Sequence, residues 1–426
     1  MNKAYHFLLS LLIAVSLAAC TEDTTEPPFT ICPGEETEDY FLLNPGRRTI
    51  IAYITGDNNL SGVLSKDITE MVGGSTGLQE DCRLIVFADI NGQTPYIANI
   101  RDGKLTKVRE YENEFYSTSP DSMRSVFQWI IDHYPSTEYA AIISGHGSGP
   151  IIKQDTVQSE FIKHFAYGYD GAGEVSATST SKWMNIPSMA MALTSLHDSE
   201  GQGIAFSYIF FDCCCMQTAE VAYELRNSAK YIIAPLSETP GGGADYNQTM
   251  IAALCLGTDE VPQGVITNYA NESDLCISAI RPDQMEALCA ATRKALKTIQ
   301  PNDGSPLILN RAHCVYYYKG SETGTTRTPV LHELKQLMKI NLSEDDYAEW
   351  LPYLERTVVA KHLTTRWLTV MDINFYDFQD YLTDEYFGGL SMIAPTDVYD
   401  EHQSDINATM LQLQWCNAVG WRELGW

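Results

Sequence analysis

Two short segments carry the side chains whose types and spacing could do covalent chemistry. Residues 140–149 read AAIISGHGSG and place His146 between Gly145 and Gly147. Glycine leaves the backbone uncovered, so a substrate carbonyl can approach main-chain N–H groups, as an oxyanion site requires. Residues 209–216 read IFFDCCCM and carry three adjacent thiols. A thiol beside an imidazole is a nucleophile and base pair suited to acyl transfer.

Residue types alone leave the nucleophile open among Cys213, Cys214 and Cys215. All three follow an apolar run and precede a predicted helix, where the helix N-terminus and a nearby imidazole are expected to favour the thiolate. Each segment also has a structural alternative, a core histidine in the first and a strand tail of buried thiols in the second. The pair predicts catalysis only if the fold brings the two segments together.

The chemistry therefore depends on the elements that position these segments. Strands are predicted over 49–54, 83–88, 139–143, 204–211 and 231–235, with helices between them over 120–131, 185–197 and 218–230. Apolar strands separated by helices predict an α/β fold with a mainly parallel central sheet covered on both faces. Sites in such sheets lie at the carboxyl ends of strands, where both segments fall. The later pattern is less regular, with helices expected over 332–340 and 344–362 and a strand over 388–394.

The N-terminal residues are predicted to direct export rather than to fold. Lys3, an apolar stretch over 7–14 and the LAAC that ends at Cys20 are too short a pattern to span a membrane and are typical of a secretory signal. The small residues before Cys20 resemble a bacterial lipobox, and the acidic residues after it resemble surface-export signals of Bacteroidetes lipoproteins. We therefore expect residues 1–20 to be a lipoprotein signal peptide and Cys20 to be lipidated, anchoring the exported chain to the outer membrane, cell surface or periplasmic face. An ordinary cleaved signal is the alternative. Residues 21–47, rich in Thr, Glu and Pro, are predicted to be a flexible tether.

The net charge of the chain limits the classes of partner that it can bind. The 426 residues carry 28 Lys and Arg against 55 Asp and Glu, a formal net charge of -27. A field of that sign repels phosphate backbones and argues against nucleic acid as a partner. It attracts cationic peptides, although an acidic surface also serves solubility.

The 11 cysteines predict neither a metal site nor a particular disulfide. No two of them have the CxxC spacing of a structural zinc or redox site. Setting aside Cys20 and the run at 213–215 leaves an odd number, and their spacings name no partners. Several are expected to be buried as small hydrophobic residues.

The Cys segment and the helix after it carry a family resemblance. Residues 212–225 read DCCCMQTAEVAYEL and resemble the clostripain-like cysteine peptidases (the C11 family, relatives of caspases, gingipains and legumain) in the Asp, the central Cys, the Met and the EVAYEL run. The HG pair at 146–147, the DNNL turn at 57–60, the DITEM run at 67–71 and the GLS element at 389–391 match the family in the same order. The resemblance implies a caspase-like α/β/α sandwich over 48–300, with 301–426 as a C-terminal extension packed on it.

The resemblance also implies roles for individual residues. Its register selects Cys214 as the nucleophile and His146 as the partner that protonates the leaving amine, with the amides of Gly147 and Cys214 holding the oxyanion. Asp212 would lie in the S1 pocket and pair with Arg or Lys at P1. The alternative for Asp212 is a buried strand-end aspartate that bonds local amides. Ser237 and Glu238 match the segment that pairs with the substrate backbone.

Two departures weaken the expectation of a basic P1 residue. Gly242 stands where the family has an acid, and Ala244 stands where it has a Trp. Both changes predict a wider or altered pocket. They also motivate the alternative that the chain is a catalytically inert or differently specific binding lipoprotein on the same fold.

The function expected from the resemblance is endopeptidase hydrolysis of peptide or protein substrates. Relatives are cut between the His and Cys segments, so the polar insertion at 151–182, which carries Lys153, Lys163 and Lys182, is predicted to hold a maturation cut or to cover the cleft. A plain surface loop is the alternative. No cofactor and no metal are expected; calcium helps some relatives, but no EF-hand-like spacing is present. Ligase or transpeptidase activity would use the same dyad.

Overall fold

The strand that precedes the DNNL turn, β2 (Gly46–Gly56), lies inside a large sheet of the computed structural model. The structure describes residues 29–30, 44–111, 115–152, 167–170, 182–272, 276–301, 304–319, 329–364, 366–369, 374–377, 383, 385–402 and 405–426. The signal segment with Cys20, nearly all of the tether, and residues 153–166 and 171–181 of the insertion lie outside the described residues. No helix of the described chain is both long enough and apolar enough to cross a membrane.

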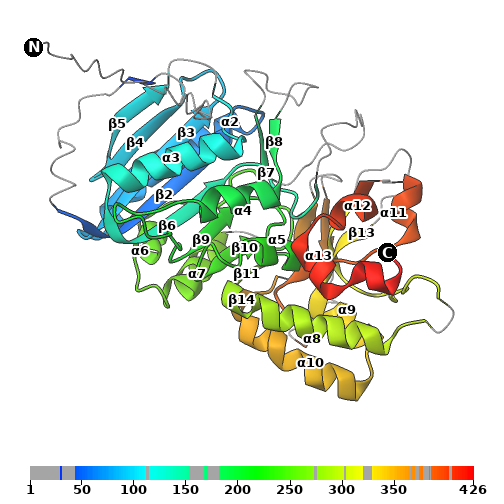
Figure 1. The fold of residues 1–426 in the computed structure, drawn as a ribbon. Coiled ribbons are helices and arrows are strands. Elements are labelled where there is room, and N and C mark those ends of the chain that lie inside the picture. Colours follow the sequence, from blue (N-terminus) through cyan, green and yellow to red (C-terminus); the bar gives the residue numbers. More distant parts are fainter. Residues whose placement is uncertain are drawn as a thin grey trace, which may run out of the picture.

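The sheet has ten strands in the order β1-β5-β4-β3-β2-β6-β9-β10-β11-β14 (Figure 1). Its central strands β3, β2, β6, β9 and β10 run parallel, and the strands on either side are antiparallel. The bounds are β1 Phe29–Thr30, β3 Cys82–Ile90, β4 Tyr96–Arg101, β5 Lys104–Tyr111, β6 Ser136–Ser144, β9 Ile209–Asp212, β10 Ile232–Pro235, β11 Ile277–Ile280 and β14 Val358–His362. The predicted α/β fold with a mainly parallel centre is confirmed.

Both faces of the sheet are buried, which explains the unbroken apolar runs of its strands. Along β2, Ile51 and Tyr53 belong to one hydrophobic core, whereas Ile50 and Ala52 belong to the other. The first core is covered by α3 (Pro120–His133), α4 (Ile186–Thr194) and α5 (Ala219–Glu224), and the second by α2 (Ser61–Gly74), α6 (Gln248–Leu254) and α7 (Val261–Glu272).

The chain from α8 (Met285–Thr298) onward builds a second, smaller assembly beside β14 (Figure 1). It contains a three-stranded sheet, β12-β13-β17, and several helices. The bounds are β12 Tyr316–Lys319, β13 Pro329–Glu333, β17 Ser391–Ile393, α9 Leu334–Asn341, α10 Glu344–Thr357, α11 Asp397–His402, α12 Asp405–Met410 and α13 Gln414–Val419; the hairpins β7 Tyr167–Asp170 with β8 Lys182–Met184, and β15 Arg366–Thr369 with β16 Asn374–Asp377, are separate.

The C-terminal assembly is tied to the helix that follows the cysteines. Glu220 and Glu224 of α5 accept hydrogen bonds from the backbone N–H groups of Ile393 (2.9 Å) and Gln414 (2.5 Å). Both glutamates are buried, and burial raises the pKa of Glu220 to about 7. The two glutamates of the EVAYEL run therefore hold the extension against α5 rather than facing a substrate.

Several elements differ from their predictions. The strand predicted over 204–211 is confined to β9, which begins at Ile209, and the helix predicted over 218–230 ends with α5 at Glu224. Residues 344–362 were expected as one helix, but α10 ends at Thr357 and β14 begins at Val358, because this β-branched residue pairs with Ile280 of β11 in the main sheet. His332, expected to start a helix, lies in β13. The hairpin of β4 and β5 was not predicted, although its Asp102-Gly103 turn, with both φ angles positive, is a strong hairpin signal.

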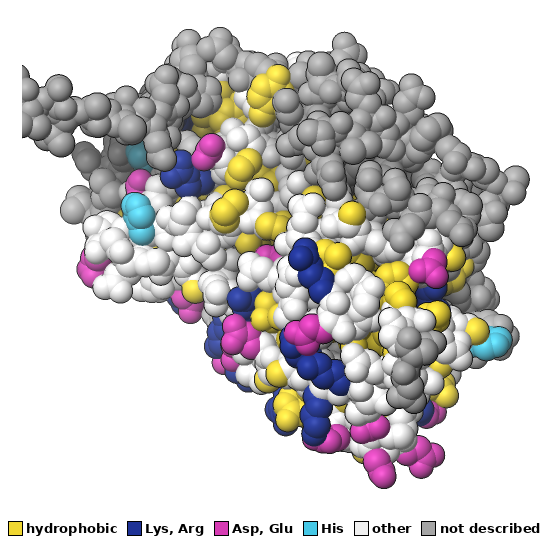
Figure 2. Space-filling view, turned by 45° about the vertical axis from the view of Figure 1, so that its right-hand side comes forward, with side chains coloured by type: hydrophobic (Ala, Val, Ile, Leu, Met, Phe, Trp, Pro, Cys, Tyr) yellow, Lys and Arg dark blue, Asp and Glu magenta, His cyan; other side chains and the backbone are white. Residues whose placement is uncertain are grey.

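The negative net charge is not gathered into one patch on the face that Figure 2 shows. There, Lys and Arg side chains lie among Asp and Glu side chains. Several surface ion pairs bridge separate elements, among them Arg226–Glu286 at 3.1 Å and Arg293–Glu423 at 2.5 Å. Exposed pairs of this kind add little stability each, and their mixing leaves no single-signed surface on this face.

Candidate active site

The register of β6 and β9 brings the His and Cys segments to the same edge of the sheet. The two strands are parallel neighbours, and Ser144 lies opposite Asp212. His146 lies two residues after Ser144, and Cys214 lies two residues after Asp212. Both loops therefore leave the sheet side by side. This is the carboxyl edge, where the sequence places the chemistry.

The two loops meet through their backbones, and glycine permits the contact. A Cβ on Gly147 would lie 2.5 Å from the carbonyl oxygen of Cys214 and 3.1 Å from its nitrogen. A Cβ on Gly149, whose φ is +64°, would lie 2.7 Å from the carbonyl oxygen of Cys215. Neither distance leaves room for a side chain, so these glycines set how closely the imidazole segment approaches the thiol segment.

His146 is held by a residue that the sequence did not single out as functional. Its Nε2 lies 2.7 Å from Oδ1 of Asn59, and its carbonyl accepts the N–H of Gly168 at 2.7 Å. Asn59 belongs to the turn after β2, and β2 is the neighbour of β6 in the sheet. The sequence signal that could have found Asn59 is the polar DNNL turn at the end of a strand. That turn reaches His146 only because β2 and β6 are neighbours in the sheet.

Cys214 is the one partly exposed thiol of the three, whereas Cys213 and Cys215 are buried. Its Sγ accepts a hydrogen bond from the N–H of Thr239 at 3.3 Å and lies 3.4 Å from the Thr239 hydroxyl. Burial and the negative charge of Glu238 raise the pKa of Cys214 to about 11, against the opposing bonds from Thr239. The expectation that a helix N-terminus would favour the Cys214 thiolate is wrong, because α5 begins only at Ala219, five residues after Cys214.

The side chain of Asp212 lies on the opposite side of β9 from Cys213 and Cys215, and both of its oxygens accept hydrogen bonds. Its carboxylate accepts hydrogen bonds from the hydroxyls of Tyr246 (2.8 Å) and Tyr269 (2.9 Å) and from the N–H of Ala244 (3.1 Å). Burial raises the pKa of this carboxyl despite these donors. A Cβ on Gly243 (φ +53°) would lie 2.8 Å from both of its oxygens. These contacts favour the alternative of local bonding; substrate contact by Asp212 stays a prediction.

A second buried acid, Asp67 of α2, lies near Asp212 and was not predicted as a site residue. Its side chain is buried, and its Oδ1 has no hydrogen-bond partner in the part of the chain that the structure describes. Burial, together with the charges of Asp212 and Glu70, raises its pKa to about 8. Two carboxyls from separate elements thus share one low-dielectric region behind β9.

The segment after β10 runs beside the nucleophile. The carbonyl of Ser237 accepts the N–H of Cys215 at 3.0 Å, and the side chains of Ser237 and Glu238 are buried. Ala244 is buried as well, whereas a Cβ on Gly242 would meet no atom within 4 Å. The position where the family carries an acid is therefore open space. Substrate pairing by Ser237 and Glu238 stays a prediction.

No three His, Cys, Asp or Glu side chains converge on a position for a metal ion anywhere in the described ranges. Among the acidic groups around the site, Asp67 and Asp212 are buried, and Asp212 is bonded to tyrosines. A calcium effect stays untested.

A parallel-centred α/β sandwich with a thiol and an imidazole on adjacent strand ends is the architecture of the caspase-like cysteine peptidases. The model of the clostripain family, Peptidase_C11, matches residues 52–368, and the chain belongs to this family. The predicted family is thereby confirmed.

Individual relatives agree with this assignment. Clostripain of Hathewaya histolytica is 26% identical over 259 residues, which cover 54% of this chain and 44% of clostripain, so the chain spans less than half of that relative. A secreted C11 cysteine protease from Bacteroides thetaiotaomicron, solved with an irreversible peptide inhibitor, has a TM-score of 0.70 at 24% identity, covering 89% of this chain and 100% of that one. An inactive zymogen C11 protease from Parabacteroides distasonis has a TM-score of 0.70 at 21% identity, covering 88% of this chain and 99% of that one. At these identities the solved structures show a shared fold.

Proposed function

We propose that this chain is an exported cysteine endopeptidase that uses Cys214 as its nucleophile and His146 as its general acid and base. The observation that carries the proposal is the β6–β9 register, which sets the two loops side by side with Gly147 packed against the Cys214 backbone. The family membership supports a thiol peptidase, and the partial exposure of Cys214 distinguishes it from its two buried neighbours.

The proposed reaction is hydrolysis in two steps. The Cys214 thiol loses its proton to His146, the sulfur bonds to the scissile carbonyl carbon, and the amides of Gly147 and Cys214 stabilise the oxyanion. His146 then gives the proton to the leaving amine, and water releases the acyl group from the sulfur. Because burial holds the pKa of Cys214 near 11 in the free protein, the thiol is protonated at rest, and proton transfer accompanies substrate binding.

The substrate preference is proposed to be Arg or Lys at P1, with Ser237 and Glu238 pairing with the substrate backbone. Support comes from the two buried carboxyls, Asp212 and Asp67, one of which has an unpartnered oxygen among the described residues. A cation in this region would offset the burial that raises both pKa values. The open space at Gly242 fits a pocket wider than that of relatives.

Export, anchoring and maturation complete the proposal. Cys20 would carry the lipid, and a cut within 151–182 would convert a zymogen into the active form. The related secreted and zymogen structures support export and latency for proteins of this fold. The insertion lies directly after the His146 loop, where Ile151 and Ile152 are buried, so a cut there would act on the chain that leads out of the site.

The deciding experiment compares the mature chain, starting after Cys20, with three variants: Cys214→Ala and the matched controls Cys213→Ala and Cys215→Ala. Each is incubated with a mixed peptide library under reducing conditions, with and without calcium, and cleavage sites are read by mass spectrometry. We expect cuts after Arg or Lys that disappear only in Cys214→Ala. Cuts after other residues would keep the dyad and overturn the P1 assignment.

Latency is tested in the same assay by nicking the protein with limited trypsin before the library is added. Activity that appears only after a nick within 151–182 supports the zymogen. If no peptide is cut before or after nicking, the inert binding lipoprotein becomes the better description. Added amine nucleophiles would reveal transpeptidation as new peptide bonds in the products.

A further inference from the structure

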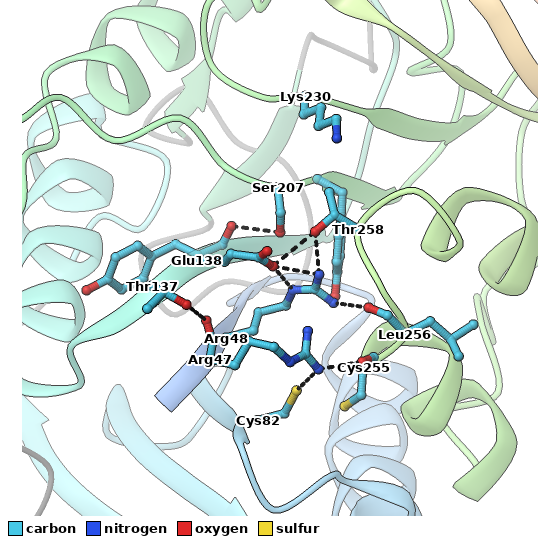
Figure 3. A network of polar contacts seen from close by, with 12 residues as sticks. Arg47, Arg48, Cys82, Thr137, Glu138, Ser207, Lys230, Cys255, Leu256 and Thr258 are labelled. Atoms are coloured by element: carbon cyan, nitrogen blue, oxygen red, sulfur yellow. Dashed lines mark hydrogen bonds and ion pairs between the residues drawn. The ribbon is translucent and has the colours of Figure 1, made fainter. Parts of the chain in front are cut away.

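Two arginines at the start of β2 organise the edge of the sheet opposite the candidate active site (Figure 3). Arg48 is fully buried and donates to the carbonyls of Leu254 (3.0 Å) and Leu256 (2.7 Å). Arg47 donates to the carbonyl of Cys255, between them, at 2.7 Å. These three carbonyls belong to the C-terminal end of α6, so the arginines fasten that helix end to the first strand of the sheet.

The same network brings two thiols together. Cys82 is the first residue of β3, Cys255 caps α6, and both are fully buried. Their side chains are close enough to influence one another, and Arg47 Nη2 donates to Cys82 Sγ at 3.0 Å. In Figure 3 the two sulfur atoms point toward one another. One guanidinium therefore contacts both cysteines and holds β3 and α6 in register at this point.

A positive charge lies beside both cysteines. Arg47 Nη2 donates to Cys82 Sγ at 3.0 Å and to the carbonyl of Cys255 at 2.7 Å. A neighbouring guanidinium favours the thiolate, which is the form that attacks a disulfide. Either cysteine can therefore start the exchange, and the other closes the bond.

We propose that Cys82 and Cys255 form a structural disulfide when the exported chain meets an oxidising compartment. Contact between two buried thiols on separate elements is the geometry that a disulfide requires, and secreted chains form such bonds where the environment permits. The proposal depends on export and does not depend on peptidase activity. Spacing in the sequence gave no reason to pair these two cysteines; the fold brings them together.

The oxidant is a disulfide donor, either a protein or a small molecule. The thiolate of one cysteine attacks one sulfur of the donor and releases one donor thiolate, which leaves a mixed disulfide on that cysteine. The other cysteine then loses its proton and attacks the first cysteine's sulfur, releasing the second donor thiolate. One disulfide bond forms and one breaks, and the two electrons lost by the cysteines reduce the donor to two thiols.

With this disulfide the protein would contain two kinds of cysteine, one that must stay reduced and one pair that stays oxidised. Cys214 is partly exposed and must be reduced for the proposed catalysis, whereas the Cys82–Cys255 pair is buried at the far edge of the sheet. A mild reductant would therefore restore the nucleophile without opening the staple, because buried disulfides resist thiol attack. The loop that the bond closes contains both catalytic segments, so the staple holds the sheet that positions them.

The direct test is a disulfide map of the mature chain. The protein is secreted into a bacterial periplasm, quenched in acid, alkylated with N-ethylmaleimide in denaturant and digested with trypsin without reduction. Because Pro282 prevents cleavage after Arg281, the tryptic peptide that carries Cys255 extends to Arg293 and also carries Cys276 and Cys289; a second cleavage at Asp259 separates Cys255 from both. We expect the peptide ending at Arg83 to be cross-linked to the peptide of Cys255 in most chains. Maleimide on both Cys82 and Cys255, or either cysteine linked elsewhere, overturns the proposal.

A melting experiment tests the same bond by its consequence. The double variant Cys82→Ala/Cys255→Ala is compared with the oxidised wild-type chain and with Cys289→Ala, which removes a buried thiol of α8. Strong reductant in denaturant-free buffer is expected to lower the Tm of the wild type and of Cys289→Ala by about 5 °C and to leave the double variant unchanged. Equal reductant sensitivity in all three proteins contradicts the proposal, and the mapping result stands even if the double variant fails to fold.

Discussion

The two edges of the central sheet are built on opposite principles. At the amino edge, the guanidiniums of Arg47 and Arg48 each donate to several acceptors, among them the carbonyls at the C-terminal end of α6. At the carboxyl edge, two loops approach through Gly147 without a side chain between them, and buried oxygens of Asp67 and Ser237 have no partner among the described residues.

The difference shows where the molecule keeps room for a ligand. A buried polar atom without a partner destabilises the free protein, and at the carboxyl edge an incoming group can satisfy the oxygens of Asp67 and Ser237. A guanidinium with all its donors engaged, by contrast, locks strands and helix into one arrangement. The amino edge therefore contributes rigidity, and the carboxyl edge contributes the site. Four changes test this division, in order of expected effect.

The largest effect is expected at the amino edge, from Arg48→Met. Removing this buried guanidinium breaks its hydrogen bonds to Glu138 and to the carbonyls of Leu254 and Leu256, which should lower the free energy of unfolding by about 3–5 kcal/mol. Urea unfolding measures the loss. Arg281→Met, at an exposed pair with Asp283, is the control and should cost about 0–1 kcal/mol. The division fails if the folded fraction of Arg48→Met has a changed kcat/KM.

At the carboxyl edge, Gly147→Ala should reverse that pattern. Its Cβ would lie 2.5 Å from the Cys214 carbonyl oxygen, so the loops must separate and the proposed oxyanion amide must shift. We expect kcat/KM to fall by about 100-fold, comparable to the loss of an oxyanion donor. Gly203→Ala, whose Cβ meets no atom within 4 Å and which has no role in the proposed site, is the matched control. Wild-type rates in Gly147→Ala would remove this glycine from the site.

Asp67 predicts how stability depends on pH at the carboxyl edge. Its pKa is about 8 in the folded protein, against an ordinary value of 3.8, so the folded state holds a proton that the unfolded state releases. Stability is therefore complete below about pH 4 for this group and is lost as pH rises toward 8. Asp67→Asn should flatten the profile, and its gain in stability over the wild type should grow by about 4 kcal/mol between pH 5 and pH 8, measured by urea unfolding at both pH values.

Asp121→Asn, an exposed acid of α3, is the control for that profile. Its stability should follow the wild type at both pH values. If Asp67→Asn follows the wild type as well, the Asp67 carboxyl is not protonated in the folded chain, and the region behind β9 is better solvated than its burial indicates.

The smallest effect is expected from Asn59, which positions His146. Asn59→Ala removes the acceptor 2.7 Å from His146 Nε2 and should lower kcat by about tenfold with little change in KM, because it orients a catalytic group without touching substrate. Asn59→Asp keeps an oxygen in the same place and should restore most of the rate. A rise in KM without a fall in kcat would instead place Asn59 in substrate binding.

Sequence reasoning reached the fold through local signals. Unbroken apolar runs such as the one ending at Ala88 predicted strands buried on both faces, and Pro120 marked the start of α3, as the structure has it. It failed where pairing partners decide: Val358 enters a strand because β11 lies beside it, and a helix was the local expectation. The hairpin turn at Asp102-Gly103 carried a readable signal that was not used.

By itself, the sequence determined the kinds of groups at the two strand ends, their glycine flanks and the family to which the chain belongs, because these depend on residue types and short spacings. Only the tertiary structure decided their partners. The order of strands sets Asn59 beside His146 and Cys82 beside Cys255, and burial raises the pKa of Cys214 where a helix terminus was expected to lower it. The physical reason is that hydrogen-bond partners and desolvation depend on segments that are distant in sequence, and no local pattern records which of them become neighbours.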